Sequence, residues 1–201
     1  MYYTKLSFLL LILLLGGCIS VPPRESSPPT IKEENKSNQQ PLEERFLTRY
    51  QIAITELNNN NLEEAKKYFL ELIETQPEFA GPRANLALIY IKQRRYDKAE
   101  ENIRLALEKN PNMAQALNIA GVIENRKGNI TKAKKYYEKA ISKKEDYALA
   151  HYNLALLYDV YLQNIRKAVD HYQRYLLLID YEDKRTKVWV EELKRNITSD
   201  I

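Results

Sequence analysis

The sequence has little of what supports a disulfide framework or a catalytic centre. Of its 201 residues, one is cysteine, two are histidine and five are glycine. A single cysteine cannot form a disulfide within the chain. His151 and His171 have no third ligand at the spacing of a metal site, and no glycine-rich phosphate loop, nucleophile elbow or HExxH motif occurs. These absences predict a protein that is not an enzyme and holds no metal or other cofactor.

A charge excess of one sign is also lacking. The 31 basic and 27 acidic residues leave a formal net charge of only +4. Binding to nucleic acid or to an anionic membrane surface through charge alone requires a stronger basic excess. Nucleic acid is therefore not an expected partner, and since no catalytic motif occurs, a small-molecule substrate is not expected either. Because glycine is scarce while alanine, leucine, lysine and glutamate are common, the composition favours helix.

The N-terminus has the pattern of a secretory signal. Lys5 precedes an apolar run from Leu6 to Leu15, and small residues lead from there to Cys18. The run of about ten residues is shorter than the roughly 20 that cross a bilayer as a helix. The pattern resembles the lipobox of bacterial lipoproteins, which implies a signal peptide at 1–17 and a lipid on Cys18. An ordinary cleaved signal with an incidental cysteine is the alternative.

The resemblance also implies a location. In bacterial lipoproteins a residue other than aspartate after the lipidated cysteine directs the protein to the outer membrane, and here that residue is Ile19. Residues 18–42 are rich in proline and polar residues, and they bury too little apolar surface to offset the entropy of ordering. We therefore expect a lipid-anchored protein of the bacterial envelope, facing the periplasm, with a disordered tether between lipid and domain.

A repeat occupies most of the remaining chain, at 43–180. Its most regular positions are alanines spaced by 34, 34 and 35 residues, at Ala65, Ala99, Ala133 and Ala168. Apolar residues recur three before and four, seven and eight after each alanine, which is one face of an α-helix. A second helical segment precedes each of these helices, with short breaks between the two. Proline follows the first two units at Pro77 and Pro111.

This pattern resembles the tetratricopeptide repeat family. The resemblance implies an all-α fold: a right-handed solenoid of about four helix-turn-helix repeats. Stacked repeats need a terminal cap, and residues 181–201 supply a candidate helix with Trp189, Leu193 and Ile197 along one stripe. That helix is interpreted as a cap, with a docking helix anchored by Trp189 as the alternative. Antiparallel packing in the fourth repeat can bring the two histidines together, and we interpret both as ordinary packing or surface residues.

The family resemblance also implies where a partner binds. The first helices of such repeats line a concave groove that receives a peptide, and side chains there bury apolar groups or hydrogen-bond a backbone. Carried onto this sequence, the groove positions are Tyr50, Ile54, Leu57, Ala84, Asn85, Leu88, Ile91, Asn118, Val122, Asn125, Tyr152, Asn153, Leu156 and Asp159. The alternative for any one of them is packing between repeats.

The combined features predict an outer-membrane adaptor that binds another envelope protein. The lipobox and repeats together resemble type IV pilus pilotin lipoproteins, which implies a role in assembling a pilus or its secretin. A run from Tyr152 to Leu162, followed by Trp189–Leu193, resembles some repeat proteins of TonB-type transport systems, which gives an accessory transport lipoprotein as the alternative. A further alternative is a structural envelope scaffold without a discrete peptide ligand.

Overall fold

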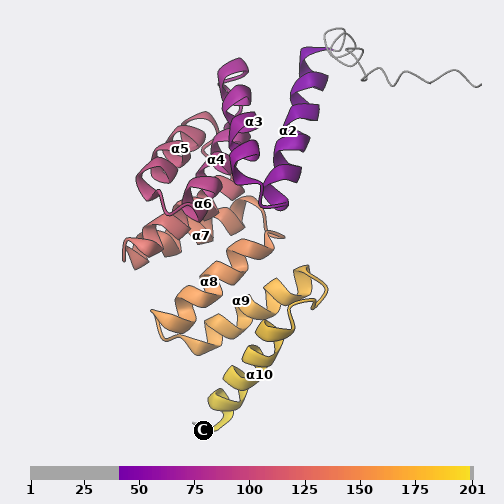
Figure 1. Ribbon diagram of the computed structural model, residues 1–201. Helices are drawn as coiled ribbons and strands as arrows, with labels where there is room; N and C mark the ends of the chain where they lie inside the picture. The colour runs from indigo at the N-terminus through magenta and orange to yellow at the C-terminus, as the bar shows by residue number, and fades with distance from the viewer. Residues whose placement is uncertain (1–40, 200–201) are drawn as a thin grey trace, which may run out of the picture. The chain divides into compact units, whose positions relative to one another are not determined.

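The computed structural model describes residues 41–199, with side chains up to Ile197 (Figure 1). The predicted signal peptide at 1–17, Cys18 and the predicted tether at 18–42, apart from its last two residues, lie outside the described residues. Within the described part, no helix combines the length and apolar character needed to span a membrane.

Residues 41–199 form nine α-helices joined by short turns (Figure 1). In chain order these are α2 (Leu42–Asn58), α3 (Leu62–Thr75), α4 (Ala80–Lys92), α5 (Tyr96–Lys109), α6 (Ala114–Arg126), α7 (Ile130–Lys143), α8 (Ala148–Val160), α9 (Ile165–Leu178) and α10 (Lys184–Ser199).

Consecutive helices pair as α2 with α3, α4 with α5, α6 with α7 and α8 with α9, and each pair packs on the next. The predicted all-α fold built from helix-turn-helix repeats is therefore confirmed. The predicted breaks fall between the paired helices, and the two prolines lie just beyond the ends of α3 and α5. The apolar residue three before each repeat alanine is the first residue of its helix, at Leu62, Tyr96, Ile130 and Ile165.

The turn inside each repeat uses one residue in the left-handed backbone region. This residue is Asn60 in the first repeat, Arg94 in the second, Gly128 in the third and Gln163 in the fourth, with φ of 62°, 59°, 80° and 49°. Glycine adopts this conformation without a steric cost, whereas a residue with a Cβ does not. The repeats thus keep one turn geometry even where the sequence has no glycine.

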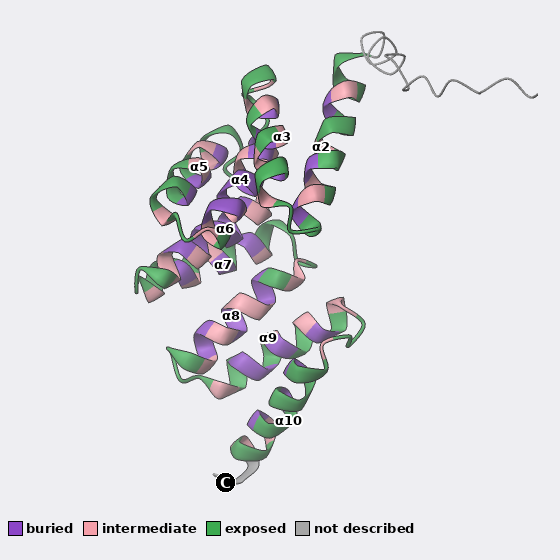
Figure 2. Cartoon of the chain, viewed as in Figure 1, coloured by how far each residue is buried: buried purple, intermediate pink, exposed green. Residues whose placement is uncertain are grey.

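The core of each repeat places a small residue against a large one. The four repeat alanines are fully buried, and buried positions lie on the helix sides that face neighbours (Figure 2). In the third repeat, Gly121 of α6 packs against Tyr137 of α7, and a Cβ added at Gly121 would lie within 3.0 Å of three atoms of the tyrosine ring. Burial raises the pKa of the Tyr137 hydroxyl. Helices α6 and α7 can pack this closely because Gly121 has no side chain.

Helix α10 packs on α9 at the end of the repeats. Its buried face carries Val190 and Leu193, which are 2% and 4% exposed, with Ile197 partly buried. The stripe predicted from the sequence is wrong at one position, because Trp189 is 43% exposed and Val190 takes its place. Asp183 caps the start of α10, since it accepts hydrogen bonds from the Thr186 backbone N–H at 3.0 Å and from its hydroxyl at 2.7 Å.

Candidate functional site

The first helices of the repeats form a shared surface, which we call the inner face. Helix α2 contacts α4, α4 contacts α6, and α6 contacts α8, in addition to the contacts inside each repeat. The second helices α3, α5 and α7 instead contact the first helices before and after them. Because the first helices approach one another more closely, the surface they build is the inner side of the stack. The predicted groove residues all lie on these first helices.

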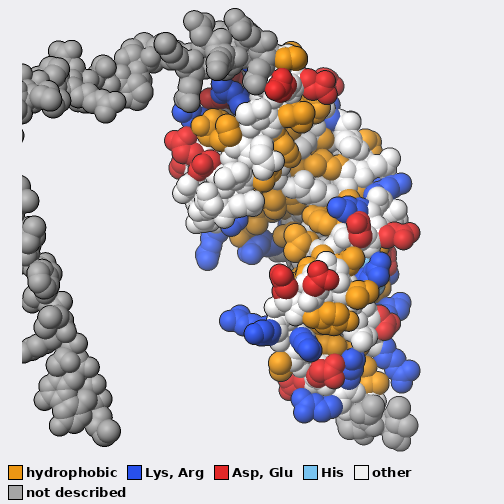
Figure 3. Space-filling view, turned by 90° about the vertical axis from the view of Figure 1, so that its right-hand side faces the viewer, with side chains coloured by type: hydrophobic (Ala, Val, Ile, Leu, Met, Phe, Trp, Pro, Cys, Tyr) orange, Lys and Arg blue, Asp and Glu red, His pale blue; other side chains and the backbone are white. Residues whose placement is uncertain are grey.

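A row of aliphatic side chains runs along the inner face. Ile54, Leu88, Val122 and Leu156 occupy the same position in the four repeats, 34 residues apart, and each is only partly buried. We call these residues the aliphatic row. Hydrophobic side chains form a band between charged ones on the face shown in Figure 3. Partly buried aliphatic groups at regular spacing can bury the apolar side of a bound segment.

Amide side chains hydrogen-bond across the first three repeats. The Asn85 amide Nδ2 donates to the Tyr50 hydroxyl at 2.7 Å and to the Gly81 carbonyl at 3.1 Å. The Gln115 amide Nε2 donates to Asn85 Oδ1 at 2.8 Å. Burial raises the pKa of the Tyr50 hydroxyl, and the Asn85 hydrogen bond opposes that shift. The network fixes Asn85, which is 2% exposed, between neighbouring helices.

A second amide pair joins the third and fourth repeats. The Asn153 amide Nδ2 donates to Asn118 Oδ1 at 2.9 Å, and Asn118 also hydrogen-bonds the Tyr147 hydroxyl, whose pKa is raised mainly by burial. Asn118 is 5% exposed, whereas Asn153 is partly exposed. Asn85 and Asn118 therefore hold the repeats together, and their side-chain hydrogen bonds are internal.

The remaining predicted groove residues differ in how deeply their side chains are buried. Ala84 is fully buried and Leu57 is 8% exposed, so both lie beneath the surface. Ile91, Asn125, Tyr152 and Asp159 are partly exposed. The Asn125 oxygen Oδ1 is buried without a hydrogen-bond partner among the described residues. This oxygen is closed off from the surface, so a segment bound on the inner face does not reach it.

A hollow of about 340 Å³ lies at the C-terminal end of the inner face. Helix α8 contributes Tyr152, Leu156, Asp159 and Val160, and α10 contributes Arg185 and Trp189. The indole Nε1–H of Trp189 donates to Asp159 Oδ2 at 2.8 Å, which ties α10 to α8. The sequence predicted Trp189 as an alternative binding anchor. It did not predict that Val160 and Arg185 lie beside Trp189, because their proximity depends on how α10 packs.

The two histidines meet on the other side of the fourth repeat. His151 Nδ1 and His171 Nδ1 are 3.0 Å apart, and His151 Nε2 lies 3.1 Å from the Glu145 carbonyl oxygen. The prediction that packing brings them together is confirmed. Burial lowers the pKa of both imidazoles. Among the described residues, no group of three or more histidine, cysteine, aspartate or glutamate side chains could hold a metal ion.

Comparison with protein families and curated proteins identifies the repeat. The family model for the tetratricopeptide repeat matches residues 50–114 and, in a second placement, residues 84–146. The protein O-mannosyl-transferase TMTC3 of Homo sapiens is 24% identical over 147 residues, which are 66% of this chain and 16% of that protein. TMTC3 of Mus musculus gives the same identity and coverage. The chain thus spans about a sixth of the length of these relatives.

Solved structures share the fold. PilF of Pseudomonas aeruginosa superposes with a TM-score of 0.67 at 18% identity, over 84% of this chain and 72% of that one. The tetratricopeptide repeat protein TTC0263 of Thermus thermophilus gives 0.64 at 19% identity, over 79% of this chain and 84% of that one. MamA gives 0.54 at 18% identity, over 74% and 82%. At these identities the similarity establishes the arrangement of helices.

Proposed function

This chain belongs to the tetratricopeptide repeat family, and we propose that it is an adaptor that binds a segment of another envelope protein along its inner face. The aliphatic row is the observation that carries the proposal. Four aliphatic side chains at one repeat position remain partly exposed, and Ile54, Leu88 and Val122 also pack against the core beneath them. An amphipathic or extended segment gains affinity by covering such a row.

The inner face offers polar complementarity beside the row. Asn153 is partly exposed, and Asn125 has a buried acceptor without a partner in the described part of the chain. Both amides lie on first helices, at the flanks of Val122 and Leu156. The partly exposed Asn153 amide can hydrogen-bond the backbone of a bound segment, whereas the Asn125 oxygen is closed off from the surface. Apolar burial would thus supply affinity, and Asn153 would help to set the register of the segment.

We further propose that the adaptor is a lipoprotein of the outer membrane that acts in assembling a pilus or its secretin. The signal-like N-terminus, with Cys18 after an apolar run, supports the lipid anchor. Support for the pilus role comes from the resemblance to pilotin lipoproteins and from the fold shared with PilF. This function requires binding and no catalysis, so the proposed role is non-enzymatic and needs no cofactor besides the covalent lipid.

Affinity capture from detergent-solubilised envelopes tests the proposal. The full-length protein with a C-terminal tag is compared with Leu88→Glu and Leu156→Glu, which place a carboxylate in the aliphatic row. Leu70→Glu is the matched control, because Leu70 is 45% exposed on the second helix α3. Circular dichroism first checks that all variants keep their helix content.

The captured proteins decide between the candidate roles. Loss of secretin or pilus subunits from both row variants, but not from Leu70→Glu, supports pilus assembly. Loss of TonB-type components supports the transport role instead. Identical capture by all variants contradicts binding through the inner face and favours a scaffold. Mass spectrometry of the mature N-terminus, with Cys18→Ser as the comparison, tests the anchor independently of the partner.

A further inference from the structure

The hollow between α8 and α10 has the features of an anchoring pocket for one side chain of the bound segment. It lies directly beyond Leu156, where the aliphatic row ends, so this inference rests on the proposed function. Its volume of about 340 Å³ is near the lower end of the range of ligand pockets, about 300–1,000 Å³. A site of this size accommodates a single large side chain and the backbone beside it.

Aromatic rings form the walls of this hollow. Tyr152 and Trp189 line it, and Tyr172 contributes from α9. The Tyr152 ring packs edge-on against Tyr172, with centroids 5.8 Å apart, and this contact fixes its orientation. Trp189 is held by its hydrogen bond to Asp159 and yet remains 43% exposed. Fixed, partly exposed aromatic rings favour an aromatic occupant, because ring pairs attract one another beyond the burial of their area.

The two charged groups of the hollow differ in how well they are satisfied. Asp159 Oδ2 accepts from Trp189 Nε1 at 2.8 Å and from the Tyr172 hydroxyl at 3.3 Å. Arg185 is exposed, and no described side chain hydrogen-bonds or pairs with its guanidinium. A guanidinium has five N–H donors and binds carboxylates through two of them at once. Both donors to Asp159 are neutral, so its carboxylate keeps its charge, and Arg185 supplies the hollow with hydrogen-bond donors that no described side chain uses.

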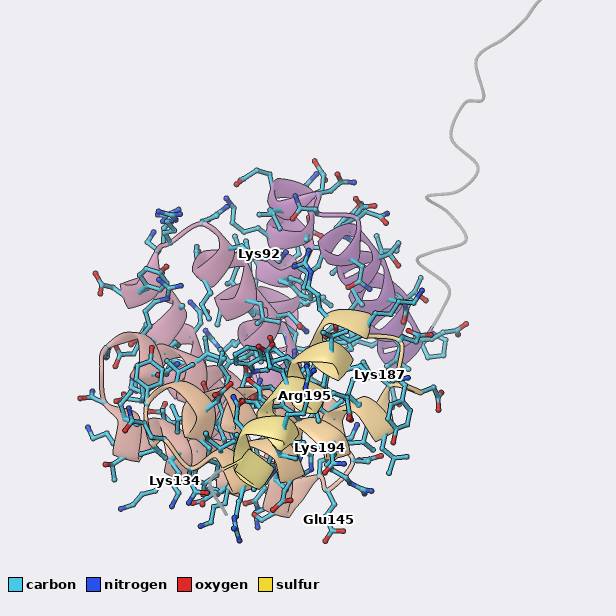
Figure 4. All side chains as sticks on the ribbon, turned by 90° about the horizontal axis from the view of Figure 1, so that it is seen from below. Lys92, Lys134, Glu145, Lys187, Lys194 and Arg195 are labelled. Atoms are coloured by element: carbon cyan, nitrogen blue, oxygen red, sulfur yellow. The ribbon has the colours of Figure 1, made fainter. Side chains whose placement is uncertain are left out.

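The other basic residues of α10 lie outside the hollow. The helix carries five basic residues and two acidic ones, and Lys187, Lys194 and Arg195 lie along it (Figure 4). Lys194 pairs with Glu191 at 2.9 Å. By helical spacing, Lys187 and Lys194 lie on the opposite side of α10 from Arg185 and Trp189, so Arg185 is the cation of α10 that lines the hollow. Charge complementarity thus points to one carboxylate beside the aromatic side chain.

We propose that this hollow binds an aromatic side chain of a peptide segment, with a neighbouring glutamate or aspartate of that segment paired to Arg185. The aromatic ring packs between Tyr152 and Trp189. The rest of the segment continues past Leu156 along the aliphatic row. Helix α10 is then both the cap of the last repeat and part of the binding surface.

Fluorine NMR titrations with short peptides test the pocket on the full-length protein in detergent. The probes contain 4-fluorophenylalanine in place of phenylalanine: acetyl-Ala-Phe-Glu-Ala-amide, its glutamine counterpart, and acetyl-Ala-Ala-Phe with a free terminal carboxylate. We expect the glutamate peptide to bind at least about threefold more tightly than the other two. Trp189→Ala should weaken its binding about tenfold, and Arg185→Gln should remove the preference for glutamate.

Val188→Ala is the matched control, because Val188 neighbours Trp189 but is 66% exposed and does not line the hollow. It should bind as the wild type does. Arg185→Gln changes an exposed, unpaired side chain, so it tests the pocket even if Trp189→Ala weakens the fold. Equal binding of the glutamate and glutamine peptides overturns the inference, as does tighter binding of the terminal carboxylate or no binding in the millimolar range. Envelope capture that still depends on Leu88 would leave the proposed function standing in each of these cases.

Discussion

The turn inside each repeat allows a backbone effect to be measured without a change in packing. Gly128 and Arg94 occupy the same turn position in adjacent repeats, with φ of 80° and 59°. A Cβ built on Gly128 meets no heavy atom within 4 Å, so Gly128→Ala introduces no clash. The left-handed conformation costs a residue with a Cβ about 1–2 kcal/mol. Alanine also lowers the conformational entropy of the unfolded chain relative to glycine, which offsets about 0.4–1 kcal/mol of this cost.

Gly128→Ala should therefore lower the free energy of unfolding by about 0.5–1 kcal/mol, and Arg94→Gly should raise it by a similar amount. Urea denaturation followed by circular dichroism measures both changes, and the slope of each transition should match the wild type. The double variant should be close to the wild type in stability, because the turns lie in different repeats. Changes of the same sign in the two single variants would refute this account of the turn.

Three other predictions follow from the packing. Gly121→Ala should lower the unfolding free energy by about 1–3 kcal/mol, because its methyl group overlaps the buried Tyr137 ring; Tyr137→Leu in the same chain should restore part of that loss in urea denaturation. Burial lowers the pKa of His151 and His171 in the folded state. The free energy of unfolding should therefore be highest above the pKa of an unfolded histidine, about 6.5, and should fall as the pH drops below it. Urea denaturation at about pH 8, 6 and 5 measures this dependence, and His171→Phe should reduce it. Asp183→Ala removes the acceptor at the start of α10 and should cost about 0.5–2 kcal/mol, with a flat response arguing against a capping role.

The repeat architecture could be predicted from the sequence because its signals are local and periodic. Every repeat alanine is fully buried, and the four apolar residues placed three before them begin the second helices. Spacing within a helix fixes which residues share a face, and repetition makes that pattern unambiguous. The helix pairs and their breaks therefore appear where the sequence places them.

The depth of side chains on the inner face could not be read from spacing. Asn85 and Asn118 share a face with Leu88 and Val122. Both amides are nevertheless buried, and they hydrogen-bond residues 30 to 35 positions away in the sequence. The rotation of α10 was also mispredicted, because packing against the neighbouring helices buries Val190 and leaves Trp189 partly exposed. Spacing identifies a face of a helix, whereas neighbouring repeats decide how much of it remains exposed.

The hollow beside Trp189 was the least predictable feature. It combines side chains from α8, α9 and α10, and its central contact joins Asp159 to Trp189 across 30 residues. No local motif encodes such a pairing, since it depends on how α10 packs against α9. A lone tryptophan in a terminal helix was the one signal of it available in the sequence.

Photo-crosslinking in living cells tests most directly whether the aliphatic row contacts a partner. A benzoylphenylalanine is placed at position 88 in the row, and in a second strain at position 70 on α3. A specific crosslink to an envelope protein is expected from position 88, and none to that protein from position 70. Crosslinks to the same protein from both positions, or from position 70 alone, would contradict binding through the inner face.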